Sequence, residues 1–483
     1  MSSQASSHGL RRSAVRERLG YPIIDCDGHT VEHLPAVLDY LRDLGGPDMV
    51  ARLVNGGADY YNRGLWGQLA PEERHRRHLM RPPWWAVPAK NTLDRATATL
   101  PKLLHERLDE IGIDFTVLFP SQRPSEIDEA ELRVAACRAY NRFHADLFRP
   151  YQDRMTPAAV IPMHTPREAI DELEYAVREL GFKVVLMPTY ARRRADASDS
   201  HRLANPVEFH LDFFAIDSDY DYDPVWAKCV ELKVVPAFHS AGMGWGSRRS
   251  SNYMYNHIGH FGSAAEGLCK ALFMGGVTRR FPELRFAFLE CGVAWAASLY
   301  SDLVGHWKKR NAEVIRQYDP AALDRALFAD LFRRYGGPLV LGARAGENSA
   351  AENPGSIDEW AACGIRKAED IRKLFVDAFY FGCEADDRMN AVAFNPALLP
   401  FGARLGAVFS SDIGHWDVPD MTKVVDEAYE LVEEGVVSAQ NFRDFVFTNP
   451  LRMWTALNKN FFKGTVIESH LDRPADRADT AAG

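Results

Sequence analysis

Acidic and histidine side chains follow the ends of short apolar segments at four places in this chain. The first segment runs from Ile23 and Ile24 through Asp25 and Cys26 into Asp27-Gly28-His29. Side chains two residues apart in an extended chain point to the same side, so Asp27 and His29 can reach one ion. The alternative is an acid that caps a helix and a histidine in an ordinary hydrogen bond. Alone, this spacing indicates a metal site only weakly.

Three further apolar segments end in the same way. Pro236-Ala237-Phe238 leads into His239, Phe286 to Leu289 into Glu290, and Val408 to Ser411 into Asp412. If these segments are parallel strands of one barrel, their carboxyl ends meet at a single mouth. Buried carboxylates and histidines there need partners or an ion to offset their desolvation. The four ends together predict a metal site.

Short apolar runs of strand length alternate with longer segments whose apolar residues recur every three or four positions. Eight strands are predicted: Tyr21–Asp25, Phe115–Phe119, Ala158–Ile161, Val184–Met187, Val234–His239, Leu284–Glu290, Ala378–Phe381 and Ala407–Ser411. This alternation favours an α/β fold, a (β/α)8 TIM-type barrel with its site at the carboxyl ends of the strands. A doubly wound open sheet is the competing fold, but no Gly-x-Gly-x-x-Gly follows any strand.

Long insertions and two termini interrupt this repeat. Long loops in a barrel usually serve as lids or binding walls, and we expect cap and lid insertions at about 36–104, 190–223 and 240–261. The predicted division is a flexible N-terminus over 1–19, one barrel over 20–464, and a disordered tail over 465–483.

Composition narrows the class of partner. The 483 residues have a net charge of −9 with no basic block, which argues against nucleic acid. Seven widely spaced cysteines without a Cys-x-x-Cys pair are typical of a reducing cytosol. With no secretory signal and no apolar run of about 18 residues, we expect a cytoplasmic protein without a membrane segment. A small-molecule substrate is the expected partner, and a homo-oligomer stays open.

The order of these motifs resembles a known family. Asp27-x-His29, His239 and Ser411-Asp412 are similar to the amidohydrolase-related branch of the amidohydrolase superfamily, which includes metal-dependent decarboxylases and hydrolases. The resemblance spans roughly Tyr21 to Asn458 and implies that Asp27, His29, His239 and Asp412 hold the metal. Related decarboxylases end strand six in a catalytic histidine, where this chain has Glu290. Their mechanism therefore does not transfer directly.

The number of candidate ligands suggests more than one ion. The predicted metal ligands are Asp27, His29, Glu32, His239, Glu290 and Asp412. An oxygen-rich set of this size favours two divalent ions, with iron preferred and zinc or manganese possible. The count and the chain length also resemble non-haem diiron monooxygenases with an amidohydrolase-type barrel from terpenoid pathways. That resemblance implies hydroxylation of a bulky apolar carboxylic acid, free or as its coenzyme A thioester.

Several of these residues admit a second role. Glu32 can be a ligand or the first-turn acid of a helix that begins near Thr30. His257 and His260 are three residues apart, so one of them can face the metals, and we prefer His260. His415 can be an outer partner of the site or an acid/base.

Three functions follow from this site. The leading hypothesis is an oxygen-dependent monooxygenase with Asp412, Glu290, His260 and His415 as catalytic residues. The second is a metal-dependent hydrolase or non-oxidative decarboxylase in which Asp412 is the general base. The third is a binding protein that has kept the barrel and lost its chemistry.

Overall fold

Eight short strands form one parallel sheet in the computed structural model, which describes residues 13–57, 63–81, 90–194, 209–239, 249–338 and 358–471. Neighbours pair in the order β1-β2-β3-β4-β7-β8-β9-β10. Their bounds are β1 Ile24–His29, β2 Phe115–Phe119, β3 Met155–Val160, β4 Val184–Met187, β7 Val235–Phe238, β8 Phe286–Phe288, β9 Phe379–Glu384 and β10 Gly406–Ser410. All eight predicted strands are confirmed.

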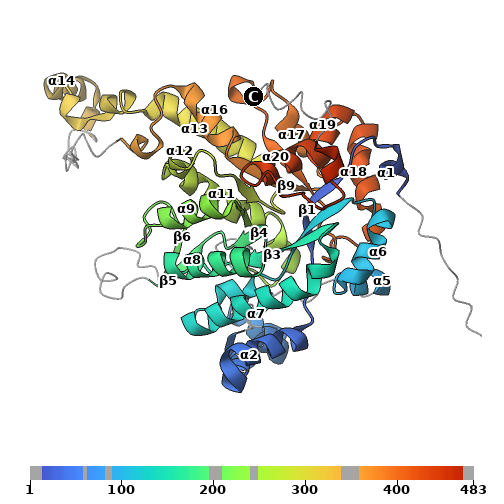
Figure 1. Cartoon of the computed structure of the whole chain (residues 1–483). Coiled ribbons are helices and arrows are strands. Elements are labelled where there is room, and N and C mark those ends of the chain that lie inside the picture. Colours follow the sequence, from blue (N-terminus) through green and yellow to red (C-terminus); the bar gives the residue numbers. More distant parts are fainter. Residues whose placement is uncertain are drawn as a thin grey trace, which may run out of the picture.

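The first and last strands lie side by side at their carboxyl ends. The His29 amide donates to the Ile413 carbonyl at 2.7 Å, and the Asp412 amide donates to the Asp27 carbonyl at 2.9 Å. Six of the eight strands are buried along their whole length, as expected of a parallel sheet covered by helices. The predicted barrel is confirmed, and Figure 1 shows helices around its strands.

Helices follow nearly every strand. The α-helices are α1 Ala14–Arg18, α2 Leu34–Arg52, α3 Arg63–Gln68, α4 Pro71–Arg76, α5 Thr92–Thr97, α6 Pro101–Ile111, α7 Ala130–Phe148, α8 Pro166–Glu174, α9 Asp223–Leu232, α10 Tyr253–His257, α11 His260–Met274, α12 Val277–Arg280, α13 Ala294–Arg310, α14 Arg325–Tyr335, α16 Ala368–Val376, α17 Asn390–Phe394, α18 Val424–Glu433, α19 Ala439–Arg443 and α20 Asn449–Thr455. Shorter 3-10 and π turns join them, and among the described residues no helix is long and apolar enough to cross a membrane.

The segments in which we expect insertions contain helices and a two-stranded ribbon. The segment 36–104 contains most of α2, then α3, α4 and α5. The segment 190–223 contains an antiparallel ribbon of β5 Ala191–Arg194 and β6 Phe209–Asp212. Parts of all three insertions, 58–62, 82–89, 195–208 and 240–248, lie outside the described residues.

Part of each segment that we expect to be flexible lies within the described residues. Residues 13–19 include α1, where Val15 is buried and Arg16 makes a two-pronged ion pair with Asp114. At the other end, residues 465–471 include the turn Glu468–His470, and Ile467 is buried. Flexibility is expected from polar composition, but residues 13–19 and 465–471 each have a buried apolar side chain that packs against the core.

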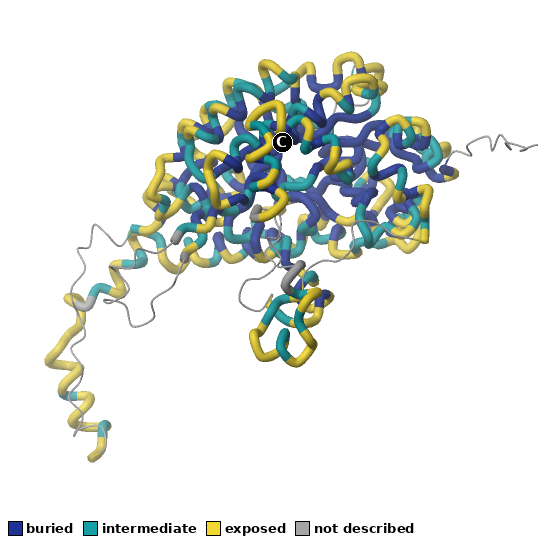
Figure 2. The backbone as a smooth tube through the Cα atoms, turned by 90° about the horizontal axis from the view of Figure 1, so that it is seen from below, coloured by how far each residue is buried: buried dark blue, intermediate teal, exposed yellow. Residues whose placement is uncertain are grey.

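One insertion was not predicted at all. After α13 the chain leaves the barrel and forms α14, which Figure 1 shows at the upper left, well away from the strands. Figure 2 shows buried backbone concentrated in the body and exposed backbone along this projection. Its helical periodicity resembles that of any barrel helix, so the pattern alone does not reveal that it leaves the body.

Candidate metal centre

β1 aims two potential ligands at the barrel mouth. The β1–β2 register shifts between Asp25 and Gly28, which is a β-bulge of the kind that often re-aims side chains beside active sites. Gly28 makes the close approach of the two strands possible, because an added Cβ would lie 2.8 Å from Thr116 Oγ1. Asp27 is completely buried and His29 almost so. The predicted alternation therefore holds, with the bulge as its local adjustment.

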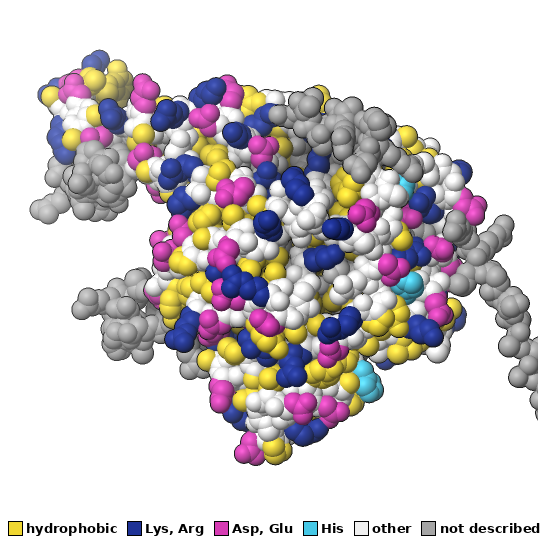
Figure 3. Space-filling model, viewed as in Figure 1, with side chains coloured by type: hydrophobic (Ala, Val, Ile, Leu, Met, Phe, Trp, Pro, Cys, Tyr) yellow, Lys and Arg dark blue, Asp and Glu magenta, His cyan; other side chains and the backbone are white. Residues whose placement is uncertain are grey.

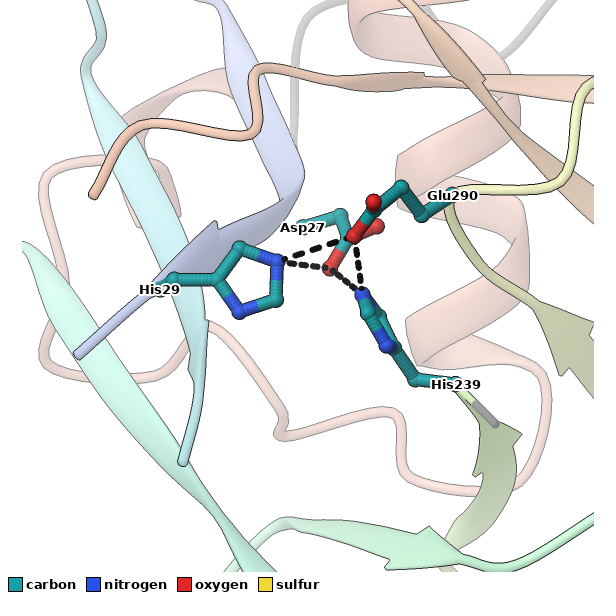
Figure 4. A group of neighbouring side chains, drawn as sticks. All are labelled: Asp27, His29, His239 and Glu290. Atoms are coloured by element: carbon teal, nitrogen blue, oxygen red, sulfur yellow. Dashed lines mark ion pairs between the residues drawn. The ribbon is translucent and has the colours of Figure 1, made fainter. Parts of the chain in front are cut away.

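β7 and β8 bring the next two ligands to the same point (Figure 4). His239 Nε2 lies 2.7 Å from Glu290 Oε2 and 3.6 Å from Asp27 Oδ1. His29 Nε2 lies 3.4 Å from Glu290 Oε2 and 3.6 Å from Asp27 Oδ1. Four side chains from three strand ends thus converge on one small volume.

The end of β10 adds a second group. Asp412 Oδ1 lies 3.0 Å from His29 Nε2 and 2.7 Å from His415 Nδ1. The His29 and His415 rings stack with centroids 3.5 Å apart. Gly414 lets the loop close over β1, since an added Cβ would lie 2.6 Å from the His29 carbonyl oxygen.

Two of these acids sit in a backbone conformation that most side chains avoid. Glu290 has φ 51° and Asp412 has φ 52°. A left-handed conformation in a non-glycine residue carries strain, and such strain is found where the surrounding structure imposes a functional orientation. Here it turns both carboxylates from the strand direction into the mouth.

A second acid of β1, Asp25, supports the cluster. Its Oδ1 accepts hydrogen bonds from the amides of Asp27 and Ser411, at 3.1 and 2.9 Å. Its Oδ2 accepts from the hydroxyls of Thr116 and Ser411, both at 2.7 Å. One buried carboxylate therefore joins β1, β2 and the end of β10 directly below Asp27 and Asp412.

The donor set fits a divalent metal ion. Seven of its atoms are buried without a hydrogen-bond partner: both carboxylate oxygens of Asp27 and of Asp412, Nε2 of His29, Nε2 of His239, and Oε2 of Glu290. An unsatisfied buried polar atom costs about 1–3 kcal/mol, and more when it is charged. A cation among these atoms would satisfy them together.

The ligand atoms form overlapping groups within 4.8 Å of one another. One group is Asp27, His29, His239 and Glu290, the next is His29, Glu290, Asp412 and His415, and a third is His257, Glu290 and Asp417. Glu290 belongs to all three. Among the described residues no cysteine joins a group, so all the donors are carboxylates and imidazoles. Iron, manganese and zinc all accept such ligands.

The pKa values of the clustered carboxylates are shifted in different directions. Burial raises the pKa of Asp27 well above its usual range, and the neighbouring Glu290 and Asp412 charges raise it further. Burial also opposes ionisation of Glu290, but its interactions with His239, His29 and His415 outweigh this and hold its pKa well below normal. Burial and the Glu290 charge raise the pKa of Asp412. Crowded acids of this kind need added positive charge before all of them can ionise.

His415 is the cluster's protonated imidazole. Burial lowers the pKa of His415, but its attraction to Asp412 and Glu290 prevails and raises this pKa well above normal. By contrast, burial and the His415 charge lower the pKa of His29. His29 is therefore the neutral, ligand-competent imidazole of the stacked pair, and His415 is the proton carrier.

Glu32 does not join the metal groups found among the described residues. Its Oε1 instead accepts the Ser121 amide at 2.6 Å and lies 3.8 Å from His144 Nε2. It is not a first-turn acid either, because α2 begins at Leu34 with His33 as its N-cap. β1 ends at His29, so the alternation that aims Asp27 and His29 inward does not extend to Glu32.

Of the two loop histidines, His257 reaches a ligand group and the preferred His260 does not. His260 is the first residue of α11, and its Nδ1 bonds to the His257 carbonyl. Burial and the neighbouring His257 lower the pKa of His260 to about 3. The helix start ties this ring back to its own loop.

Sequence reasoning missed three acids. Asp25 continues the same two-residue alternation as Asp27 and His29, a signal that was present. Glu384 ends β9, which runs three residues beyond the predicted strand, and burial followed by the Asp417 charge raises its pKa to about 8. Asp417 follows Asp412 in a loop; burial and its interaction with Asp412 raise its pKa to about 9. Nothing in the spacing of Asp417 singles it out.

A family model described as Amidohydrolase matches residues 24–349, more than half of the chain. The protein belongs to the amidohydrolase family. The matched range begins at β1 and includes Asp27, His29, His239 and Glu290, while Asp412 lies beyond it.

Solved structures are similar to this chain at low sequence identity. An amidohydrolase from Mycobacterium avium subsp. paratuberculosis is 16% identical, with 90% of this chain and 100% of that chain covered and a TM-score of 0.52. A dihydroxybenzoic acid decarboxylase from a Polaromonas species, with bound manganese, is 16% identical over 90% and 97% of the two chains (TM-score 0.47). A 5-carboxyvanillate decarboxylase from Novosphingobium aromaticivorans, complexed with manganese, is 15% identical over 92% and 98% (TM-score 0.48).

Proposed function

We propose that this amidohydrolase is a metal-dependent enzyme that hydrolyses or non-oxidatively decarboxylates a small organic acid. The observation that carries the proposal is the buried cluster of unsatisfied ligand atoms, with a proton-carrying pair, Asp412 and His415, at its edge. Asp27, His29, His239 and Glu290 would hold the first ion. When bound, a divalent ion of this kind polarises substrate oxygens and increases the acidity of water.

The chain's own groups supply the proton transfers. Asp412 and His415 lie 2.7 Å apart, and the His415 side chain is 30% exposed while Asp412 is nearly buried. His415 can therefore meet a substrate at the mouth and give up a proton, while Asp412 takes one from the interior side. Both hydrolysis and replacement of a carboxyl group by hydrogen require such an acid/base pair.

Oxygen-dependent hydroxylation of an apolar acid stays a second candidate, on one observation. His29 and Glu290 belong to both of the first two ligand groups, so the site offers positions for two ions with a shared carboxylate. Paired metals with bridging carboxylates are the arrangement that dioxygen chemistry uses in other folds.

Metal content and gas exchange separate these candidates. Protein stripped with chelator and reloaded with Mn²⁺, Fe²⁺ or Zn²⁺ would be analysed for ions per chain, then offered a panel of small carboxylic acids and esters. Release of CO₂ or a hydrolysis product without oxygen consumption supports the proposal. Substrate-dependent oxygen uptake moves the assignment to hydroxylation, and a chain that takes up none of these ions contradicts both.

A further inference from the structure

The projection that follows α13 is the least covered part of the described chain. We call residues 311–338 the arm; it contains α14. No residue of α14 is buried, whereas every other described α-helix of nine or more residues has at least three buried residues. α14 therefore has the apolar face of a packed helix, but no residue of that face is buried.

One face of α14 is apolar and exposed. The residues on this face are Leu327, Phe328, Leu331, Phe332 and Tyr335. Tyr335 is 73% exposed and the other four are between 36% and 54% exposed. The spacing places all five on one side of a helix. We call this side the α14 stripe; within it the Phe328 and Phe332 rings are tilted against each other, with their centroids 4.4 Å apart.

A helix of this length needs a partner for its stripe. Isolated helices of fewer than about 12–15 residues are marginal in water, and packing of the apolar face supplies most of their stability. α14 has 11 residues and an Asp324 N-cap that accepts the Leu327 amide at 2.9 Å. A cap of this kind stabilises a helix by only about 1 kcal/mol, so the stripe has to be covered by something.

The charges on the arm indicate which kind of partner can cover the α14 stripe. Residues 311–338 include four acids and four arginines, and Figure 3 shows both signs mixed on this projection. A helix that lies on a membrane has a polar face rich in Lys and Arg. The arm as a whole is neutral, because the three arginines of α14 are balanced by Asp330 within it and by the acids that precede it. A strongly charged protein surface would gain nothing from it either. A neutral apolar stripe is best matched by another neutral apolar stripe.

The ends of the helix carry opposite charges. Asp319 and Asp324 outnumber Arg325 at its N-terminal end, and Arg333 and Arg334, which both pair with Asp330, outnumber that acid at its C-terminal end. In an antiparallel pair of two identical helices, the acidic end of each lies beside the basic end of the other. The two helix dipoles then point in opposite directions, which is also favourable. We propose that the α14 stripe is a dimerisation surface, paired antiparallel with the α14 stripe of a second copy of this chain.

The area of the stripe suits a reversible dimer. Large apolar side chains bury about 150–250 Å² each when fully covered, and these are roughly half exposed, so a pair would bury on the order of 1,000 Å². That lies at the low end of specific interfaces. We therefore expect a dissociation constant in the micromolar range.

Sedimentation equilibrium of the full chain from about 1 to 100 μM tests this. Leu331→Glu puts a charge in the centre of the stripe and should yield a monomer at all concentrations. Ala326→Glu adds the same charge on the opposite, exposed face of α14 and should dimerise like the parent chain. A monomeric parent chain, or equal dimerisation of the two variants, would overturn the proposal. So would a parent chain that stays monomeric and co-sediments with anionic lipid vesicles.

The orientation has its own test. Replacing Arg333 and Arg334 together by Gln removes the positive end of the helix. In an antiparallel pair this loses attraction to the acidic end of the partner and should weaken the dimer several-fold. In a parallel pair it would remove repulsion between two basic ends and strengthen the dimer, which would contradict the orientation we propose.

Discussion

The metal centre and the arm are both incomplete, in opposite ways. At the barrel mouth, acids and imidazoles are buried with unsatisfied atoms, so the deficit is positive charge in a place that water does not reach. On α14, large apolar side chains are exposed, so the deficit is apolar cover. The first calls for a small cation and the second for a protein surface.

The two regions also differ in how their residues are held. The ligands of the metal centre come from the ends of four strands, β1, β7, β8 and β10, and are held by long-range contacts, such as Asp25 to Ser411 and His29 to Ile413. The described side-chain hydrogen bonds of α14 are local, such as Arg334 to Asp330 at 3.4 Å. A substitution in one region should therefore leave the other region intact. Four measurements can test this difference.

Loss of a central ligand should have the largest effect. His239→Ala removes an imidazole that faces both Asp27 and Glu290, and should abolish binding of the first ion and lower activity by more than the roughly 100-fold typical of an outer partner. Ion content by mass spectrometry and turnover of the reloaded protein are the readouts. His144→Ala, a buried histidine outside the ligand groups, is the matched control and should keep the ion.

Loss of Asp25 should come next. Asp25→Ala leaves four buried donors without an acceptor and should lower the free energy of unfolding by about 3 kcal/mol or more. It should also weaken metal binding about 10- to 100-fold, because Asp27 and Asp412 lose their support. Asp25→Asn keeps one acceptor oxygen and should lower the free energy of unfolding and the metal affinity by less. Denaturant titration and calorimetric metal binding give the two values; unchanged metal affinity in the Ala variant would confine Asp25 to the fold.

The pH dependence of the metal-free protein tests the His415 pair. Because the pKa of His415 is raised above 6.5 in the folded chain, its protonated form contributes stability that is fully present below pH 6.5. This contribution is lost as the pH rises through the folded-state pKa. The gap in unfolding free energy between the parent and His415→Gln should therefore shrink from acidic to alkaline pH. A gap that widens with pH would mean that Asp412 does not hold a proton on His415.

The smallest effect should be on the stability of the arm. Phe328→Ala trims an exposed ring, and in dilute, monomeric protein it should change the free energy of unfolding by no more than about 0.5 kcal/mol. The matched core change Phe286→Ala removes a fully buried ring between strands and should cost about 3–5 kcal/mol. Thermal or denaturant unfolding compares the two. A large loss for Phe328→Ala would show that the arm packs within one chain.

Sequence reasoning reached the barrel and most of the cluster for identifiable reasons. A strand buried on both sides is a continuous apolar run, so Phe115–Phe119 and Val184–Met187 were found to the residue. A polar residue directly after such a run marks the mouth, which located His239 and Asp412. The rule failed for Glu384 because β9 continues past Phe381, and for Glu32 because β1 ends before it.

The sequence by itself determined which segments become strands and which ligand types stand at their ends, since both depend on short-range periodicity and side-chain chemistry. Only the tertiary structure decided that β10 returns to β1, so that Asp412 meets His29, and that His257 enters a ligand group while His260 does not. It also decided that α14 leaves the barrel. Such outcomes depend on contacts between residues hundreds of positions apart, and no local pattern encodes the distance between them.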